Sequence, residues 1–191
     1  EERLAEAAGR VREFASWAGT LRRGTPVSGD TAGIGLAAAR RAVRIHHKPD
    51  RDAEFPLVGT PHVVELSPAT TLAIDPGTPW GVAEPLRTLR PGTTSVRLDE
   101  AHLEDGDEVL DRLALRPAAG RPLVVVVRDA ARYRWMTRAL TALVRRRPDA
   151  LVVEMGVPVG ERPGAVYLAT HGATRVSGIA AAEVLTGRTR P

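Results

Sequence analysis

An unbroken run of large apolar residues, Leu123-Val-Val-Val-Val127, is the feature that most restricts how this chain can fold. A strand made from such a run has no polar side, so it must be covered on both faces. Central strands of parallel sheets have this character, because helices pack on either side of them. Strands with one face in water alternate apolar and polar residues instead. The run therefore predicts an α/β domain.

Other strand-like and helix-like segments alternate on both sides of this run. Strands are expected over residues 61–67, 95–98, 123–127, 150–153 and 165–169, and helices over residues 83–89, 107–115, 135–147 and 176–185. Such alternation indicates parallel strands joined by right-handed crossovers. The sequence therefore predicts a doubly wound, mostly parallel sheet of five or six strands with helices on both faces.

The N-terminal part of the chain has a different pattern. Residues 1–21 carry apolar side chains at helical spacing and predict an amphipathic helix. A glycine-rich stretch follows, then a second helix is expected over residues 36–45 and a polar link over 46–52. The expected organisation is a helical linker over residues 1–52 and an α/β sandwich domain over residues 53–191. Because the chain begins without methionine or a secretory segment, we expect it to be a fragment of a longer protein.

Composition excludes several classes of protein. The absence of cysteine rules out a disulfide scaffold, a thiol nucleophile and a thiolate metal site, and leaves the cellular compartment open. No apolar run approaches the ~18 residues of a membrane-spanning helix, so no membrane partner is expected. The net charge is +4, but the basic residues are almost all arginine and are spread along the chain among acids. With few aromatic residues to stack on bases, the chain is not expected to bind nucleic acid.

Familiar catalytic motifs are missing or out of context. Residues 28–35, Ser-Gly-Asp-Thr-Ala-Gly-Ile-Gly, resemble the glycine pattern of short-chain dehydrogenases, but no buried strand precedes them and the Tyr-x-x-x-Lys pair is absent. His46 and His47 are adjacent and point apart, so no metal site is expected. There is no Gly-x-Ser-x-Gly, phosphate loop or His-Glu-x-x-His. We therefore expect no cofactor and no metal, and assign no catalytic residue.

Several segments resemble glycoside hydrolase family 3, and most closely its β-N-acetylglucosaminidase or β-N-acetylhexosaminidase-like branch. Residues 1–12 and 35–42 resemble the join between the catalytic barrel and the second domain of that family. The segments that resemble the C-terminal α/β domain of the branch are Pro79-Trp-Gly81, Leu123–Ala130, Pro148–Gly156, Thr170–Gly178 and residues 180–185.

This resemblance implies that the catalytic residues lie in another domain of a longer enzyme. Family members hydrolyse terminal β-linked sugars with retention, through a covalent glycosyl-enzyme on an aspartate, and this branch uses a histidine as the proton donor. Both groups belong to an N-terminal (β/α)8 barrel whose motifs are absent here. The chain is therefore expected to be inactive alone, with the missing barrel and the carbohydrate substrate of the full enzyme as its partners. Some branches supply an acid/base glutamate from the second domain, but neither Glu65 nor Glu154 is assigned that role.

The loops at the carboxyl ends of the strands are where open α/β sheets bind ligands. Six residues in these loops are candidates for contact with sugar or with another domain: Trp80, Asp129, Arg132, Glu154, His171 and Arg175. The competing interpretation is that the acids at strand ends, Glu65 among them, cap helices or line an interface. A free-standing domain that binds a small ligand or nucleotide at these loops is the alternative function. It predicts a concave pocket there, whereas a flat apolar surface favours docking.

Overall fold

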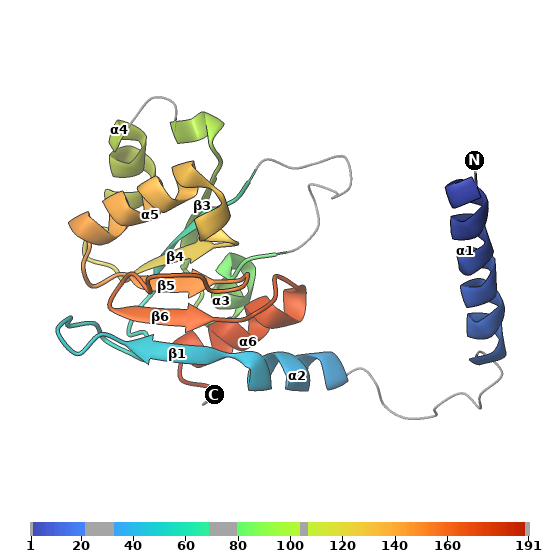
Figure 1. Ribbon diagram of the computed structural model, residues 1–191. Coiled ribbons are helices and arrows are strands. Elements are labelled where there is room, and N and C mark those ends of the chain that lie inside the picture. Colours follow the sequence, from blue (N-terminus) through green and yellow to red (C-terminus); the bar gives the residue numbers. More distant parts are fainter. Residues whose placement is uncertain (1, 22–32, 69–79, 104–106, 190–191) are drawn as a thin grey trace. The chain divides into compact units, whose positions relative to one another are not determined.

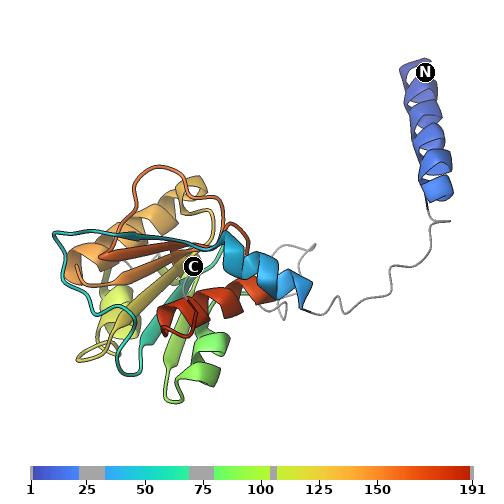
Figure 2. The same cartoon turned by 90° about the horizontal axis from the view of Figure 1, so that it is seen from below.

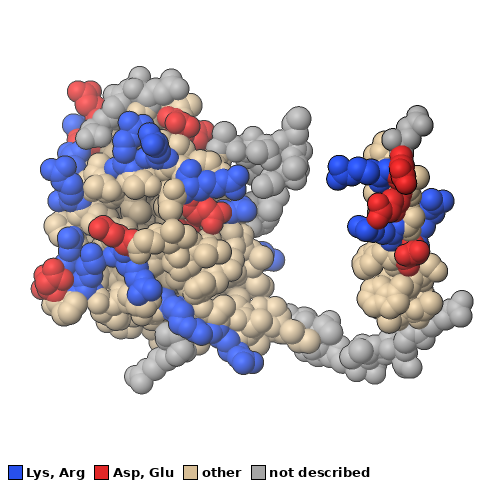
Figure 3. All heavy atoms as spheres, in the orientation of Figure 1, with Lys and Arg blue, Asp and Glu red and all other residues tan. Residues whose placement is uncertain are grey.

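The computed structural model describes residues 2–21, 33–68, 80–103 and 107–189 of the 191-residue chain. These residues belong to two compact units, Glu1–Thr31 and Ala32–Pro191. The first unit contains helix α1 (Glu2–Leu21), which buries none of its residues. Its charged side chains lie in its N-terminal part, while Phe14, Trp17 and Leu21 leave the other end uncharged and apolar (Figure 3). No helix of the described residues is long and apolar enough to span a membrane.

The second unit is built on one six-stranded sheet (Figure 1). The strands are β1 (Arg44–His47), β2 (His62–Leu66), β3 (Thr94–Leu98), β4 (Leu123–Val127), β5 (Leu151–Glu154) and β6 (Val166–Ala169). They lie in the order β1-β6-β5-β4-β2-β3, and all are parallel except β1, which runs antiparallel to β6. Every residue of β4 is fully buried, as the apolar run predicts. The expected mostly parallel α/β fold is confirmed.

Helices cover both faces of this sheet (Figures 1 and 2). On one face lie α2 (Ile34–Ala42), α3 (Ala83–Leu89) and α6 (Arg175–Leu185). On the other lie α4 (Asp107–Leu110), a π-helical turn over Asp111–Leu115, and α5 (Arg134–Arg146). Short 3-10 turns over Ala101–Leu103 and Ala130–Arg132 follow β3 and β4. Figure 2 shows α2 and α6 side by side, although they come from opposite ends of the unit.

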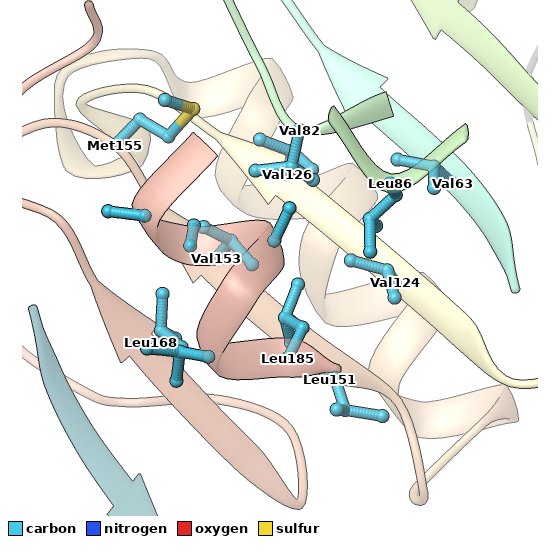
Figure 4. Close-up of a cluster of buried hydrophobic side chains, with 14 of the residues drawn as sticks. Val63, Val82, Leu86, Val124, Val126, Leu151, Val153, Met155, Leu168 and Leu185 are labelled. Carbon is cyan, nitrogen blue, oxygen red and sulfur yellow. The ribbon is translucent and has the colours of Figure 1, made fainter. Parts of the chain in front are cut away.

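The face covered by α3 and α6 has a core of close-packed aliphatic side chains (Figure 4). Valines from the strands, such as Val124, Val126 and Val153, meet Leu185 of α6 and Leu86 of α3. Each of these side chains is almost completely buried. Burying such a side chain stabilises the fold by roughly 1.5–3 kcal/mol. This core holds α3 and α6 against the sheet.

The N-terminal edge of the unit differs from the prediction. Residues 44–47 form strand β1, where the sequence predicts the end of a helix and then a polar link. Val43 is fully buried and Ile45 packs on the core, but the flanking arginine and histidines are at most half-buried, so four residues carry too little apolar pattern to indicate a strand. Because α2 packs on α6 and β1 pairs with β6, the compact unit begins at Ala32 rather than at residue 53.

The helix expected over residues 107–115 is also different in detail. It is a short α-helix over Asp107–Leu110 that continues as the π-helical turn over Asp111–Leu115. The Arg116 backbone N–H donates to the Asp111 carbonyl, a five-residue spacing that periodicity of apolar residues does not reveal. Ala114 is buried by this turn, so the same face still packs on the sheet.

Candidate functional site

Glu154 is the centre of the polar cluster at the carboxyl ends of β4 and β5. It is the last residue of β5, and only 3% of it is exposed. Its Oε1 accepts the backbone N–H of Asp129 at 2.8 Å and of Gly156 at 2.7 Å, and its Oε2 accepts the N–H of Ala130 at 3.2 Å. The carboxylate thereby joins the loop after β4 to the loop after β5.

The protonation of Glu154 follows from this environment. Burial raises the pKa of Glu154 above its ordinary value, and the neighbouring charge of Asp129 acts in the same direction. The three backbone N–H groups oppose the rise because they favour the charged form. A carboxyl group that accepts three backbone N–H groups serves first as an anchor for the two loops.

Asp129 continues the same cluster on the β4 side. It has a left-handed backbone, with φ of 55°, which aspartate tolerates better than most residues. Its Oδ1 accepts the backbone N–H of Val157 at 3.3 Å. A Cβ on Gly156 would lie 2.0 Å from that Oδ1, so the close approach of the loops requires glycine. The structure thus brings Asp129 and Glu154 together, but as parts of a backbone-binding network.

Glu65 anchors a second cluster, on the opposite face of the sheet. It is 4% exposed, and its Oε1 accepts the backbone N–H groups of Val82 and Ala83, each at 3.1 Å, where α3 begins. Its Oε2 accepts two hydrogen bonds from Arg97. The Arg97 guanidinium lies 5.0 Å from the centroid of the Trp80 ring. Glu65 therefore caps a helix, and Trp80 is covered by a charged side chain.

The three remaining candidates make few contacts. Arg132 is exposed, with its guanidinium 5.8 Å from the Tyr133 ring centroid. His171 is exposed and its Nδ1 lies 3.1 Å from the Ala42 carbonyl oxygen. Arg175 is exposed at the start of α6. The Arg132 backbone N–H donates to the Asp129 carbonyl oxygen at 2.9 Å, but among the described residues no side-chain hydrogen bond joins Trp80, Arg132, His171 or Arg175 to the Glu154 cluster. The side chains of the six sequence candidates therefore do not form one site.

A pocket of about 270 Å³ opens beside Glu154, between α5 and the loop from β5 to β6. Its walls include Glu154, Tyr167, Thr137, Leu140, Val159 and Pro163. Tyr167 lies on β6 and is 5% exposed, and burial followed by the Glu154 charge raises its pKa well above the ordinary value. In the sequence, Tyr167 lies within the strand expected over residues 165–169 and is not among the candidate site residues. The signal that could have singled it out is a phenol within an otherwise apolar buried strand.

Three further polar side chains, His62, Arg121 and Arg147, hydrogen-bond mainly to other parts of the fold. His62 is buried at the start of β2, with Nδ1 2.8 Å from the Thr94 hydroxyl and Nε2 3.1 Å from the Leu113 carbonyl oxygen, and burial lowers its pKa. A larger pocket of about 400 Å³ lies at the amino ends of the strands, but Arg121 and Arg147 beside it donate to backbone carbonyls. The part of the chain that the structure describes contains no group of three or more potential metal ligands.

Comparison with known proteins identifies one similar architecture. No protein-family model matches the chain, and no curated protein matches it. The solved structure of a glycoside hydrolase family 3 β-N-acetylglucosaminidase from Paenibacillus sp. str. FPU-7 matches with a TM-score of 0.63 and 16% sequence identity. The match covers 100% of this chain and 38% of that enzyme, so the chain spans well under half of its length. The predicted resemblance to glycoside hydrolase family 3 is therefore confirmed at the level of the fold.

Proposed function

We propose that this chain is the C-terminal accessory domain of a glycoside hydrolase of family 3, and that it contains no complete active site. The observation that carries the proposal is the extent of the structural match, which takes in the whole of this chain and 38% of a β-N-acetylglucosaminidase. The remainder of that enzyme has no counterpart here. In this proposal the helical linker leads from a (β/α)8 barrel, and hydrolysis of terminal β-linked N-acetylglucosamine or a similar sugar takes place on the barrel.

The use of the two buried glutamates supports an accessory role. Glu65 and Glu154 lie on opposite faces of the sheet and are anchored by backbone N–H groups or by Arg97. A retaining glycosidase that uses two carboxyl groups, rather than an aspartate and a histidine, holds them about 5–5.5 Å apart on either side of the bond that is cleaved. Two glutamates separated by a packed sheet do not meet that requirement. These carboxylates therefore stabilise the fold and do not cleave a glycosidic bond.

The surface that fits a barrel is the loop between β5 and β6. Val157 and Val159 on this loop are 66% and 65% exposed, and Pro158 between them restricts the backbone. The loop lies at the carboxyl edge of the sheet, beside the Glu154 cluster that anchors it. Two exposed valines on an anchored loop suit a permanent apolar contact, and we assign the catalytic barrel of the same enzyme as the partner.

An activity assay tests the inactive fragment. The isolated chain is incubated with 4-nitrophenyl N-acetyl-β-D-glucosaminide, and we expect no release of nitrophenol above the uncatalysed rate. Turnover that survives repurification would overturn the proposal. The coding sequence upstream of Glu1 supplies the complementary test. A barrel with the aspartate and histidine motifs of the family supports the proposal, and an unrelated upstream domain contradicts it.

The docking surface has its own matched test in the longer enzyme. The double substitution Val157→Ser and Val159→Ser is expected to lower the midpoint of thermal unfolding of the enzyme that contains the barrel, but to leave the isolated chain unchanged. Val58→Ser is the control, because Val58 is 60% exposed but lies beside the pocket at the amino ends of the strands. Equal effects of the two changes on the longer enzyme would rule out this surface.

A specific observation also favours the alternative function, a free-standing domain that binds a small ligand. The pocket beside Glu154 is concave and lies at the strand-end loops, which is what that alternative predicts. A nucleotide is poorly suited to it, because Glu154 and Glu161 line its wall and would repel phosphate. Ligand binding by the isolated chain without any upstream barrel in the gene would favour this alternative.

A further inference from the structure

The Tyr167 side chain marks the pocket beside Glu154. Tyr167 is 95% removed from solvent, and within the described part of the chain its hydroxyl makes no hydrogen bond. The hydroxyl is not among the fully buried atoms that lack a partner, so it is reached from the pocket that Tyr167 lines. It is therefore available to form a hydrogen bond with a ligand in that pocket.

The acceptors in the pocket wall are also incompletely used. Glu154 Oε2 accepts one hydrogen bond, from Ala130, although a carboxylate oxygen accepts two. The Thr137 hydroxyl donates to the Ala130 carbonyl and keeps its lone pairs for an incoming donor. Glu161 lines the open side of the pocket and is exposed. The wall thus offers mainly hydrogen-bond acceptors to a ligand.

The charge of the pocket wall further restricts which kinds of ligand can bind. In a chain whose basic residues outnumber its acids, the described wall of this pocket contains two glutamates and no arginine, lysine or histidine. Arg162 is close enough to influence Tyr167, but its guanidinium is directed to His46 on β1, with Nη1 3.0 Å from Nδ1. An acceptor-rich wall with net negative charge selects a cation that donates hydrogen bonds.

The remaining walls are apolar and set the size of the ligand. Leu140 on α5 and Val159 and Pro163 on the loop provide aliphatic surface in the same pocket wall. A volume of about 270 Å³ is close to the lower limit for small-molecule sites. We propose that this pocket binds a compact organic ammonium ion, with the ammonium between Glu154 and Glu161 and within reach of the Tyr167 hydroxyl, and the hydrocarbon part against Leu140 and Val159.

Three ring compounds of one size test this assignment on the isolated chain. Cyclohexylammonium, cyclohexanol and cyclohexanecarboxylate are titrated at neutral pH into the isotopically labelled chain, and backbone amide shifts are followed by NMR. We expect saturable shifts at residues such as Thr137, Leu140 and Val159, with an affinity for the ammonium of about 1 mM. Cyclohexanol should bind more weakly, and the carboxylate should not bind. A flexible probe, Nα-acetyl-lysine N-methylamide, carries the ammonium of a lysine side chain. Tighter binding of this probe than of cyclohexylammonium would indicate a lysine of a partner protein as the ligand, and tighter binding of cyclohexylammonium would indicate a free amine.

The variants separate binding from folding. Tyr167→Phe keeps the ring in the strand and should weaken cyclohexylammonium binding roughly three- to tenfold. Glu161→Gln changes an exposed residue and should weaken binding and reduce its dependence on salt. Tyr133→Phe is the control, since the chain has two tyrosines and Tyr133 does not line the pocket. Each variant is first shown to have the unfolding midpoint of the parent chain, or binding is compared at a temperature where it is fully folded.

The proposal fails on any of three results. These are equal binding of all three ring compounds, no shifts with cyclohexylammonium at tens of millimolar, or unchanged affinity in both Tyr167→Phe and Glu161→Gln. The inference is independent of the proposed accessory role, because binding is measured on the chain alone. A chain that binds the ammonium but lacks glycosidase activity satisfies both proposals, and a chain that does neither overturns this one only.

Discussion

Glu65 on β2 and Arg97 on β3 are direct neighbours in the parallel register, and one carboxylate oxygen of Glu65 accepts both the Nε (3.2 Å) and the Nη2 (2.8 Å) hydrogen bonds of Arg97. The Glu65 side chain is almost fully buried, while the Arg97 side chain is 46% exposed. The other carboxylate oxygen holds the first turn of α3. One side chain thus joins an edge strand, its neighbour and a helix.

Arg97→Met should destabilise the chain, because it leaves the buried Glu65 carboxylate with its backbone donors but without a countercharge. We expect a loss of about 1–3 kcal/mol, less than for a fully buried pair because Arg97 is half exposed. Urea denaturation of the parent chain and the variant measures this difference in the free energy of unfolding. Arg116→Met is the control, since Arg116 is 77% exposed in its pair with Asp111, and should cost at most about 0.5 kcal/mol. Similar losses in the two variants would show that the pair has no special role.

Two helical glycines should respond to alanine with opposite signs. A Cβ on Gly178 of α6 would lie 2.1 Å from the Gly81 carbonyl oxygen, so Gly178→Ala forces helix and loop apart and should cost about 2 kcal/mol. A Cβ on Gly35 of α2 would lie 4.0 Å from Val176, an ordinary contact, and Gly35→Ala should stabilise by about 0.5–1 kcal/mol. Thermal and urea unfolding of both variants measure the sign and size of each change in stability. A stabilising Gly178→Ala would contradict the described packing of α6.

Stability at low pH should depend on Glu183. This residue of α6 accepts two hydrogen bonds from Arg40 of α2, at 2.7 and 2.6 Å, which lower the pKa of Glu183 below its ordinary 4.5. The stabilisation is therefore present above pH 4.5 and is lost as the pH falls through the lower folded value. Glu183→Gln should cost about 1 kcal/mol at pH 7, and the difference from the parent should shrink as the medium is acidified. A difference that does not vary with pH would exclude this pairing.

Glu154 should show the opposite dependence on pH. Burial raises its pKa above 4.5 in the folded chain, so the folded state binds the proton more tightly than the unfolded state. Its contribution to stability is therefore fully present below pH 4.5 and declines as the pH rises through the folded pKa. Glu154→Gln keeps one acceptor for the loop amides and should destabilise more at pH 4 than at pH 7. Denaturation curves at the two pH values, with Glu183→Gln measured alongside, test whether the signs differ.

The parallel core of the fold is readable from the sequence because burial on both faces leaves a strong local signal. The valine run of β4 and the apolar face of α5, which includes Trp135 and Leu143, predict those elements within a residue or so. The same reasoning fails at β1, where a four-residue edge strand with arginine and histidine side chains has no pattern of its own. Its existence depends on pairing with β6, which is distant along the chain.

The candidate site is less predictable, since its groups acquire their roles only through register and loop approach. The position of Glu154 at a strand end is visible in the sequence, but its three backbone donors come from two loops that meet only in the folded chain. The Arg97 partner of Glu65 becomes apparent only when β2 and β3 are aligned. The sequence places Tyr167 only within an expected strand, and the folded chain is needed to show that it lines a pocket.

The pairing of β1 with β6 makes the beginning and the end of the unit depend on each other. Arg44 lies opposite Ala169 in the register, and α2 packs on α6, so the sheet edge at β6 stays open until residues from both ends are present. A chain shortened to begin at residue 53 would expose that edge and should aggregate. During synthesis, the ribosome must release almost the entire unit before β1 finds its place. This edge of the sheet is therefore completed only after every other strand has been synthesised.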